Sequence, residues 1–152
     1  MTIVVRRATA EQTRPLRHAV LRPGLPQTSS VYEQDLTAVH IGAWDGAELV
    51  GCAAVFADPW PGPPPVPDAW RLRGMAVDPS RQGLGIGGQV LAAVVKAARD
   101  SGAPMLWANG RSTALGFYRR HGWRTVGEEF ITPDTGLPHY RIVLDLTSSA
   151  NP

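Results

Sequence analysis

The order of apolar and polar positions predicts strands and helices that alternate along the first part of the chain. Residues 2–7 are rich in β-branched side chains, which favours a strand, and residues 9–22 follow as a helix. Thr9 and Gln12 have the spacing of a capping box, in which each side chain accepts a hydrogen bond from the other residue's backbone amide. Pro15 predicts either a kink in this helix or a later start, because proline has no backbone N–H.

The strongest local signal is a hairpin. Residues 37–44 and 48–57 are two apolar runs, and Asp45-Gly46 between them suits the positive φ angles of a two-residue turn. Residues 25–36 have no clear period, so we expect a loop or a short helix there.

A proline-rich segment follows this hairpin. Six of the eleven residues from 58 to 68 are proline, which excludes a helix and the interior of a sheet. The spacings Pro61–Pro64 and Pro64–Pro67 match the pattern of ligands for SH3-type grooves. A stiff connector between strands is the interpretation that we favour, and docking of a partner remains the alternative.

The second half of the chain continues the alternation. The expected elements are strand 70–77, helix 83–99, strand 105–108, helix 112–120, and strands 123–131 and 139–146. In the last strand, Tyr140, Ile142 and Leu144 alternate with His139 and Arg141, so one face should be buried and His139 should lie on the other. The order of elements predicts an α/β fold with strands of mixed direction.

Composition limits the class of protein. The chain has 152 residues, 43% of them hydrophobic and 18% charged, which fits one packed domain rather than a disordered segment. Its net charge of +2 is too small to indicate a nucleic-acid partner. Cys52 is the only cysteine, so we expect no disulfide within the chain, no cysteine-based metal site and a cytoplasmic location. The longest apolar run, residues 49–57, is too short to span a membrane, and the first residues do not have the order of a secretion signal.

The most informative segment joins strand 70–77 to helix 83–99. Four of the six residues from 83 to 88 are glycine, which lets the backbone approach a ligand closely and turn its amides toward one point. A helix start adds free N–H groups and the positive end of the helix dipole, so this place suits a pyrophosphate.

Two general phosphate-binding motifs fit this segment poorly. Gly83, Gly85 and Gly88 have the G-x-G-x-x-G spacing of dinucleotide-binding folds, but five residues separate them from the preceding strand and no acidic residue ends the next one. The ATP-binding P-loop requires Lys and then Ser or Thr after its last glycine, where this chain has Gln89 and Val90.

A third pattern resembles a known family. The segment from Gln82 to Gly87 is similar to the (Arg/Gln)-x-x-Gly-x-(Gly/Ala) signature of the GNAT N-acetyltransferases, and it follows Met75-Ala76-Val77-Asp78-Pro79, which is similar to the strand end that accompanies this signature. Residues 114–123 are similar to the second signature, A-x-x-F-Y-x-x-x-G-(F/W).

The resemblance covers residues 70–146 well and implies the rest of the architecture. We expect a single GNAT-type domain over residues 1–147, with a mixed, largely antiparallel central sheet of about seven strands flanked by helices. Residues 148–152 would form a C-terminal tail.

The resemblance also implies a cosubstrate, acetyl-coenzyme A, and the residues that hold it. Backbone amides would bind its pyrophosphate, groups of strand 70–77 would pair with its pantetheine arm, and one strand amide would stabilise the thioester oxygen. The implied cofactor-binding residues are Met75, Ala76, Val77, Gln82, Gly83, Leu84, Gly85, Ile86, Gly87, Gly88 and Asn109. Asn109 is equally explained as a residue that ends its strand before Gly110.

Tyr118 takes the position of the family's general acid, whose phenol protonates the departing thiolate. A core aromatic on the buried face of its helix is the competing explanation. An amine acceptor also needs a base, for which His139, Glu129 and His40 are candidates beside a water relay. Arg71 and Arg73 lie two apart on one strand and suggest either a positive patch or ordinary surface charge.

The predicted function is transfer of the acetyl group to a primary amine of a small molecule or a peptide. A non-catalytic module that binds acyl-CoA and a nucleotide-binding domain are the alternatives. We expect no metal, no nucleic acid and no membrane among its partners, and the resemblance is compatible with a homodimer.

Overall fold

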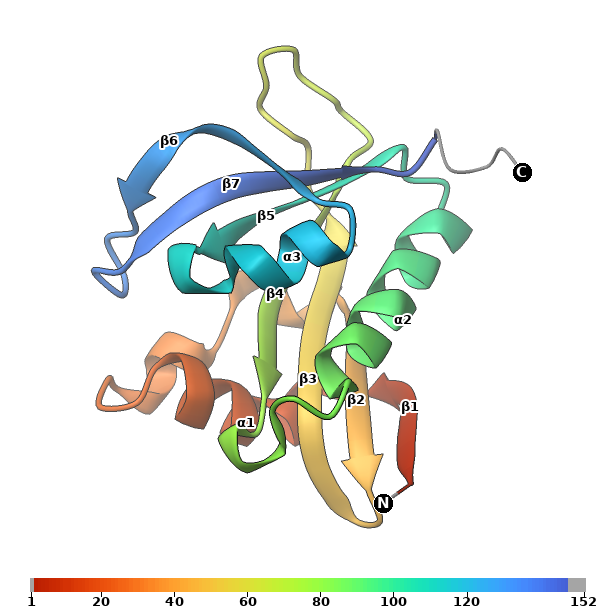
Figure 1. Cartoon of the computed structure of the whole chain (residues 1–152), viewed down its shortest axis with the longest axis vertical. Helices are drawn as coiled ribbons and strands as arrows, with labels where there is room; N and C mark the ends of the chain where they lie inside the picture. Colours follow the sequence, from red (N-terminus) through yellow and green to blue (C-terminus); the bar gives the residue numbers. More distant parts are fainter. Residues whose placement is uncertain (1, 148–152) are drawn as a thin grey trace. The chain divides into compact units, whose positions relative to one another are not determined.

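The computed structural model describes residues 2–147, so the predicted tail at 148–152 lies outside the described residues. Over the described part, the chain forms one mixed sheet with the strand order β1-β2-β3-β4-β5-β7-β6, together with α-helices and short 3₁₀ turns (Figure 1). The strands are β1 (Ile3–Ala8), β2 (Val39–Asp45), β3 (Glu48–Ala57), β4 (Trp70–Val77), β5 (Met105–Arg111), β6 (Arg124–Ile131) and β7 (Pro138–Asp145). The helices are α1 (Ala10–Leu21), α2 (Ile86–Asp100) and α3 (Leu115–Arg120), and the 3₁₀ turns are η1 (Gln27–Ser30), η2 (Glu33–Leu36), η3 (Pro79–Arg81) and η4 (Ser112–Ala114).

The strand directions confirm the predicted fold class. The pairs β1–β2, β2–β3, β5–β7 and β6–β7 are antiparallel, and β4–β5 is parallel. The chain is therefore an α/β protein with a seven-stranded, largely antiparallel sheet.

Contacts divide the chain into two compact units, which we call the first and the second unit. The first unit comprises the described residues of Met1–Phe56 and Leu72–Ala97. The second unit comprises those of Ala57–Arg71 and Ala98–Pro152.

The β2–β3 hairpin of the first unit forms where the sequence predicts it, but its turn is shifted by one residue. Asp45 pairs with Glu48, so the two central residues are Gly46 and Ala47 rather than Asp45 and Gly46. Gly46 has a φ of 60°, and among the described residues only glycines have positive φ angles. The strands are therefore joined by a two-residue turn in which Gly46 has a positive φ and Ala47 does not, and Asp45 remains paired in the strand ladder.

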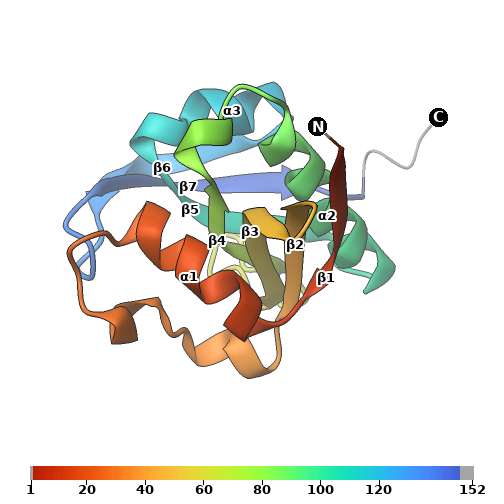
Figure 2. The same cartoon turned by 90° about the horizontal axis from the view of Figure 1, so that it is seen from below.

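Helices α1 and α2 of the first unit pack on opposite faces of strand β3 (Figure 2). A Cβ atom on Gly51 would lie 3.0 Å from Ile86 and 3.3 Å from Val90, so this face of β3 contacts α2 closely. The next side chain points to the other face, where the Cys52 sulfur lies 4.0 Å from the Thr13 carbonyl oxygen of α1.

The start of helix α1 confirms the capping box. The Gln12 amide donates to the Thr9 hydroxyl over 3.1 Å, and the Thr9 amide donates to the Gln12 side chain over 3.0 Å. Pro15 lies inside α1, so the alternative of a later start is wrong. Helix α2 begins at Ile86, three residues after its predicted start, because the glycines ahead of it form a separate loop.

The second unit contains the β5–β7–β6 part of the sheet and the proline-rich loop. Trp60 and Trp107 are buried with their ring centroids 5.5 Å apart, and Ala69 and Val143 complete this small core. Two backbone hydrogen bonds of 3.0 Å join Trp60 and Val66 and close the loop on itself. Pro61 and Pro64 therefore lie in a closed turn, which favours the stiff connector over the extended conformation of an SH3 ligand.

Two predictions about the second unit are wrong. Asn109 does not end its strand: β5 runs on to Arg111, and Asn109 pairs with Arg141 inside the ladder. His139 does not lie on a solvent face, because its residue is 7% exposed and packs against Phe130 with ring centroids 6.2 Å apart.

Candidate functional site

The glycine-rich loop of the first unit has the backbone shape that close approach to a ligand requires. Gly83 and Gly85 have φ angles of 83° and 82°, a region that other residues adopt only with strain. A Cβ atom on either glycine would meet no other atom within 4 Å, so packing does not explain their choice. Gln82 and Leu84 are exposed as well, and the loop therefore presents its backbone to the surroundings.

The start of α2 adds hydrogen-bond donors to this loop. The first bond of the helix runs from the Gln89 amide to the Gly85 carbonyl oxygen over 3.2 Å. Since the first amides of a helix have no acceptor within it, those of Ile86, Gly87 and Gly88 are available at this end. These are residues for which the sequence predicts phosphate contacts, and the geometry can bind an anion.

Both ends of the loop are fixed on the β2–β3 hairpin. On one side, Ile86 is 1% exposed and its side chain lies against Gly51 of β3. On the other side, the Arg81 guanidinium donates to the Asp45 carboxylate over 2.8 Å and to the Glu48 carboxylate over 2.9 Å. We call these two contacts the Arg81 ion pairs.

Strand β4 leads into this loop with its amides in alternating directions. The Asp78 amide donates to the Val50 carbonyl oxygen of β3 over 2.9 Å. Because successive backbone groups of a strand point to opposite sides, the amides of Met75 and Val77 point away from β3. By the same alternation the Ala76 amide points toward β3, so of the three predicted strand residues Met75 and Val77 have amides directed to the other edge of β4.

Tyr118 lies on the buried face of α3 in the second unit. Its residue is 7% exposed, and its ring packs edge-on against Trp123 and Phe117, with centroids 5.4 Å and 5.2 Å away. Burial raises the pKa of the Tyr118 phenol far above its ordinary value, because the charged phenolate is poorly solvated there. Tyr118 is therefore protonated at neutral pH, and it can donate a proton but does not act as a base.

Asn109 carries an unsatisfied acceptor. Its side-chain oxygen Oδ1 is buried and has no hydrogen-bond partner among the described residues. A buried acceptor without a donor is unfavourable, and native proteins rarely leave one unpaired. An N–H group of a bound molecule would satisfy it.

The three candidate bases differ in accessibility. His40 is 5% exposed, and its Nε2 atom lies 3.0 Å from the carbonyl oxygen of Asp35. The His139 Nδ1 atom is likewise 2.8 Å from the carbonyl oxygen of Leu137. Glu129 is exposed and accepts a hydrogen bond of 2.6 Å from the Ser112 hydroxyl, so it is the candidate that reaches solvent.

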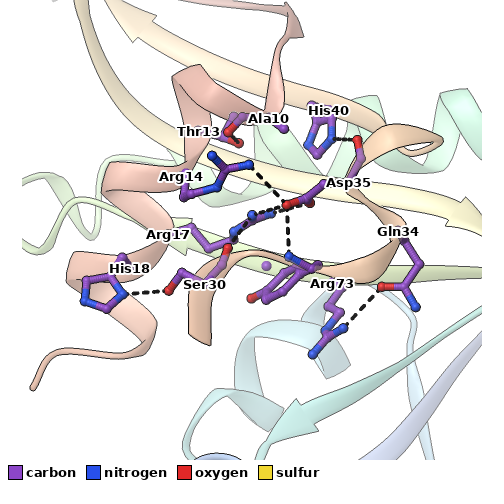
Figure 3. A network of polar contacts seen from close by, with 12 residues as sticks. Ala10, Thr13, Arg14, Arg17, His18, Ser30, Gln34, Asp35, His40 and Arg73 are labelled. Atoms are coloured by element: carbon purple, nitrogen blue, oxygen red, sulfur yellow. Dashed lines mark hydrogen bonds and ion pairs between the residues drawn. The ribbon is translucent and has the colours of Figure 1, made fainter. Parts of the chain in front are cut away.

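The sequence gives no hint of a buried ionic network in the first unit, which joins α1 to η2 (Figure 3). Arg17 is 1% exposed and donates twice to the Asp35 carboxylate, over 3.1 Å and 2.8 Å, and once to the Ser30 carbonyl oxygen over 2.6 Å. Burial by itself would raise the pKa of Asp35, but the hydrogen bonds from Arg17 and the Tyr32 amide lower it overall.

Tyr32 is the aromatic centre of this network. The guanidinium groups of Arg17 and Arg73 each lie 3.9 Å from the centre of its ring. Gly74 makes room for the Arg17 and Tyr32 side chains, because a Cβ atom there would lie 2.8 Å from Arg17 and 3.2 Å from Tyr32. Cation–π contacts thus hold η2 against α1 and β4.

Arg71 and Arg73 do not form one patch. Arg71 belongs to the second unit, where it pairs with Asp58 over 3.4 Å and lies 4.7 Å from the Trp107 ring centre. Arg73 donates to the Gln34 side chain over 3.2 Å in the first unit.

Sequence reasoning missed the Arg81 ion pairs and the Arg17–Asp35 network. An acidic residue at each end of a hairpin turn and an arginine directly before a glycine-rich loop are visible signals, but 33 and 36 positions separate Arg81 from its partners. Only the fold brings them together.

The described part of the chain contains no group of three or more His, Cys, Asp or Glu residues placed to hold a metal ion. Among residues 2–147, no helix is both long enough and apolar enough to cross a membrane.

Comparisons with known proteins agree with the fold. Residues 8–123 match the family described as Acetyltransferase (GNAT) family. The chain is 31% identical over 128 residues to the uncharacterized N-acetyltransferase YjcF of Bacillus subtilis (strain 168). The aligned residues cover 83% of this chain and 84% of YjcF.

Solved structures are similar at lower identity. FeeM, an N-acyl amino acid synthase from uncultured soil microbes, superposes with a TM-score of 0.77 at 13% identity over 95% of this chain and 91% of its own. An aminoglycoside 6'-N-acetyltransferase complexed with coenzyme A gives a TM-score of 0.74 at 14% identity over 94% and 97%.

Proposed function

Because this chain belongs to the GNAT acetyltransferase family, we propose that it transfers the acetyl group of acetyl-coenzyme A to a primary amine of a small molecule or a peptide. The transfer would occur by direct attack in a ternary complex. The observation that carries the proposal is the loop at Gly83 and Gly85, whose open, left-handed backbone leads directly into the free amides of α2.

The residues present fit coenzyme A. The amides of Ile86, Gly87 and Gly88 suit the two negatively charged phosphates. Open space over Gly83 and Gly85 leaves room for close approach of the diphosphate to the backbone. The orphaned Asn109 oxygen fits an amide N–H such as those of the pantetheine arm. The solved structure of a similar fold with coenzyme A bound supports the same cosubstrate.

Residues of this chain would supply the electrostatic part of the chemistry. Acetyl-coenzyme A brings a thioester, whose carbonyl oxygen gains negative charge as the amine attacks. A backbone amide of Met75 or Val77, directed away from β3, would donate a hydrogen bond to that oxygen and stabilise the charge. Ala76 would hold the strand through its buried side chain rather than contact the ligand.

Tyr118 is our proposal for the group that protonates the departing sulfur. Its raised pKa keeps the proton on the phenol at neutral pH, which an acid requires. The same shift makes transfer to a thiolate of pKa about 8.5 more uphill than for an ordinary tyrosine. Tyr118 would therefore act late, once the sulfur carries nearly full charge.

Glu129 is our proposal for the base, because of the three candidates it is the one that is exposed. Its carboxylate would take the amine proton directly or through water, while the Ser112 hydroxyl orients it. Proteins of similar fold include an N-acyl amino acid synthase and an aminoglycoside 6'-N-acetyltransferase, which supports an amine acceptor and does not select one.

The deep burial of Tyr118 favours a second candidate function, a module that binds acyl-CoA without catalysis. Such a module would use the same loop and keep Tyr118 only for packing against Trp123. The two candidates differ in turnover and share cosubstrate binding.

Calorimetric titration with coenzyme A tests the binding step, and release of free thiol across a panel of small and peptide amines tests the transfer. We expect saturable binding and turnover with at least one amine. Binding without turnover on any amine would support the silent module. No binding at millimolar coenzyme A would refute both.

Replacing Gly85 by Val tests the loop itself. A β-branched residue cannot adopt a φ of 82° without strain, so we expect the loop to change shape and coenzyme A binding to be lost. Gly127→Val, at a φ of 79° in the second unit with no atom within 4 Å of its added Cβ, is the matched control and should keep its binding. Undiminished binding by the Gly85 variant would count against the assignment.

A further inference from the structure

Arg81 lies directly before the phosphate-binding loop, yet its charge is already balanced. Its guanidinium is 2.8 Å from the Asp45 carboxylate and 2.9 Å from the Glu48 carboxylate. Both acids belong to the β2–β3 hairpin, one on each side of its turn. An arginine beside a diphosphate site would ordinarily be read as a phosphate ligand, but here the planar donor fork faces two anions of the protein.

The backbone next to Arg81 is attached to the same hairpin. The Arg81 amide donates to the Asp78 carbonyl oxygen over 2.8 Å, and the Asp78 side chain accepts from the Ser80 amide over 3.0 Å. The Asp78 amide in turn donates to Val50 of β3. Turn η3 is thus attached to the hairpin at Val50 by its backbone and at Asp45 and Glu48 by a side chain.

Between this attachment and α2, the loop has little support of its own. Residues 82–85 are exposed, and nothing lies within 4 Å of where a Cβ of Gly83 or Gly85 would be. The opposite end is held where Ile86 packs on Gly51 of β3. The shape of the loop therefore depends on two contacts with one hairpin. One is the apolar packing of Ile86 on Gly51, and the other is the Arg81 ion pairs.

We propose that Arg81 is a positioning residue for the coenzyme, which acts through Asp45 and Glu48 by fixing the glycine loop in the conformation that binds the diphosphate. This inference rests on the proposed function. Preorganisation of a loop increases affinity because the ordering entropy is lost on folding rather than on binding.

The sign of one mutational effect separates this role from direct phosphate binding. Were Arg81 a phosphate ligand, removal of Asp45 and Glu48 would free its charge and bring coenzyme A, an anion, closer to an uncompensated cation. Affinity would then rise. Were Arg81 a positioning residue, the same removal would release the loop and affinity would fall.

The test uses the double variant Asp45→Asn/Glu48→Gln and the single variant Arg81→Gln, with dissociation constants for coenzyme A measured by calorimetry. Both should bind about threefold to tenfold more weakly than the unaltered chain, the range expected for two partly exposed ion pairs. The control Asp68→Asn/Glu128→Gln removes the same two negative charges from exposed positions of the second unit and should change affinity less than twofold.

A kinetic measurement separates positioning from general destabilisation. At saturating acetyl-coenzyme A, kcat of the double variant should equal that of the unaltered chain, while KM for acetyl-coenzyme A rises. Arg81→Lys keeps the charge and replaces the fork by a single ammonium group, so its affinity should lie between those of the unaltered chain and Arg81→Gln.

Tighter or unchanged binding by the double variant, with the unaltered chain binding normally, would overturn the positioning role alone. A kcat that falls as much as affinity would do the same, since it would indicate loss of folded protein. Absence of coenzyme A binding by the unaltered chain would overturn the proposed function and the positioning role together.

Discussion

Replacing Asp35 by Asn should destabilise the first unit more than its small change in shape suggests. The substitution is isosteric, but it removes the negative charge that compensates Arg17, which is 1% exposed and bound by two hydrogen bonds of 3.1 Å and 2.8 Å. Removal of one partner from a buried ion pair costs about 3–5 kcal/mol, because the remaining charge cannot be solvated.

The lower end of that range is the better expectation here. An asparagine oxygen can still accept one Arg17 hydrogen bond, and the Ser30 carbonyl oxygen keeps its contact of 2.6 Å. About 3 kcal/mol corresponds to a fall in Tm of about 6–12 °C for a chain of this length. Urea titration and calorimetry measure the two quantities independently.

The control is Asp68→Asn, an exposed acid for which we expect a change within about 0.5 kcal/mol. Acidification provides a second check. The pKa of Asp35 is lowered in the folded chain, so its ionised form stabilises the fold above the ordinary carboxyl pKa of about 3.9, and this contribution disappears as the pH falls through the lower, folded value. The variant and the unaltered chain should therefore begin to converge in stability below about pH 4 and become equal once the pH lies below the folded pKa of Asp35. A loss under 1 kcal/mol at pH 7, or a difference that persists at low pH, would refute the charge argument.

Three further predictions concern single residues. Gly74→Ala should lower the free energy of unfolding, measured by urea titration, by about 2 kcal/mol or more, because a Cβ there would meet Arg17 at 2.8 Å and the residue has a φ of 70°. The control Gly116→Ala in helix α3 should be neutral or stabilising, and equal effects of the two substitutions would contradict the reasoning. Tyr118→Phe should lower kcat by about 100-fold and leave the dissociation constant for coenzyme A within twofold. In the unaltered chain, burial raises the pKa of Tyr118, so kcat should show no alkaline fall from loss of the Tyr118 proton below pH 10. Parallel losses of kcat and affinity in the variant would indicate that Tyr118 serves only for packing. Burial raises the pKa of Cys52 to about 12, so above the ordinary thiol pKa of about 8.5 the unfolded chain loses this proton first and stability should fall with pH, with a slope that approaches about 1.4 kcal/mol per pH unit near pH 10. Cys52→Ala should flatten this dependence, and an equal slope in both proteins would exclude the thiol as its cause.

Local chemistry made several features predictable from the sequence. The capping box at Thr9 and Gln12 depends on residues three positions apart, and strand β4 was predicted with its observed bounds. The glycines at 83 and 85 do have the left-handed backbone that their spacing suggested. In each case neighbouring residues determine the outcome.

The errors arise where distant residues decide. Asn109 looked like a strand end because a turn-forming glycine follows it, but pairing with β7 extends the strand to Arg111. His139 looked exposed from its alternation, but it packs against Phe130 of β6. The acidic partners of Arg17 and Arg81 lie 18 to 36 positions away, beyond the reach of any local pattern.

The burial of the only thiol makes Cys52 a probe of the first unit. A labelling reagent added to the native protein can react only when the packing around Cys52, to which α1 and β4 contribute, opens, so the reaction rate measures how often that part of the chain opens. Four of the five tryptophans, at positions 60, 70, 107 and 123, belong to the second unit, and intrinsic fluorescence therefore follows mainly that half. Labelling kinetics and emission together can establish whether the two units of this chain unfold in one step or separately.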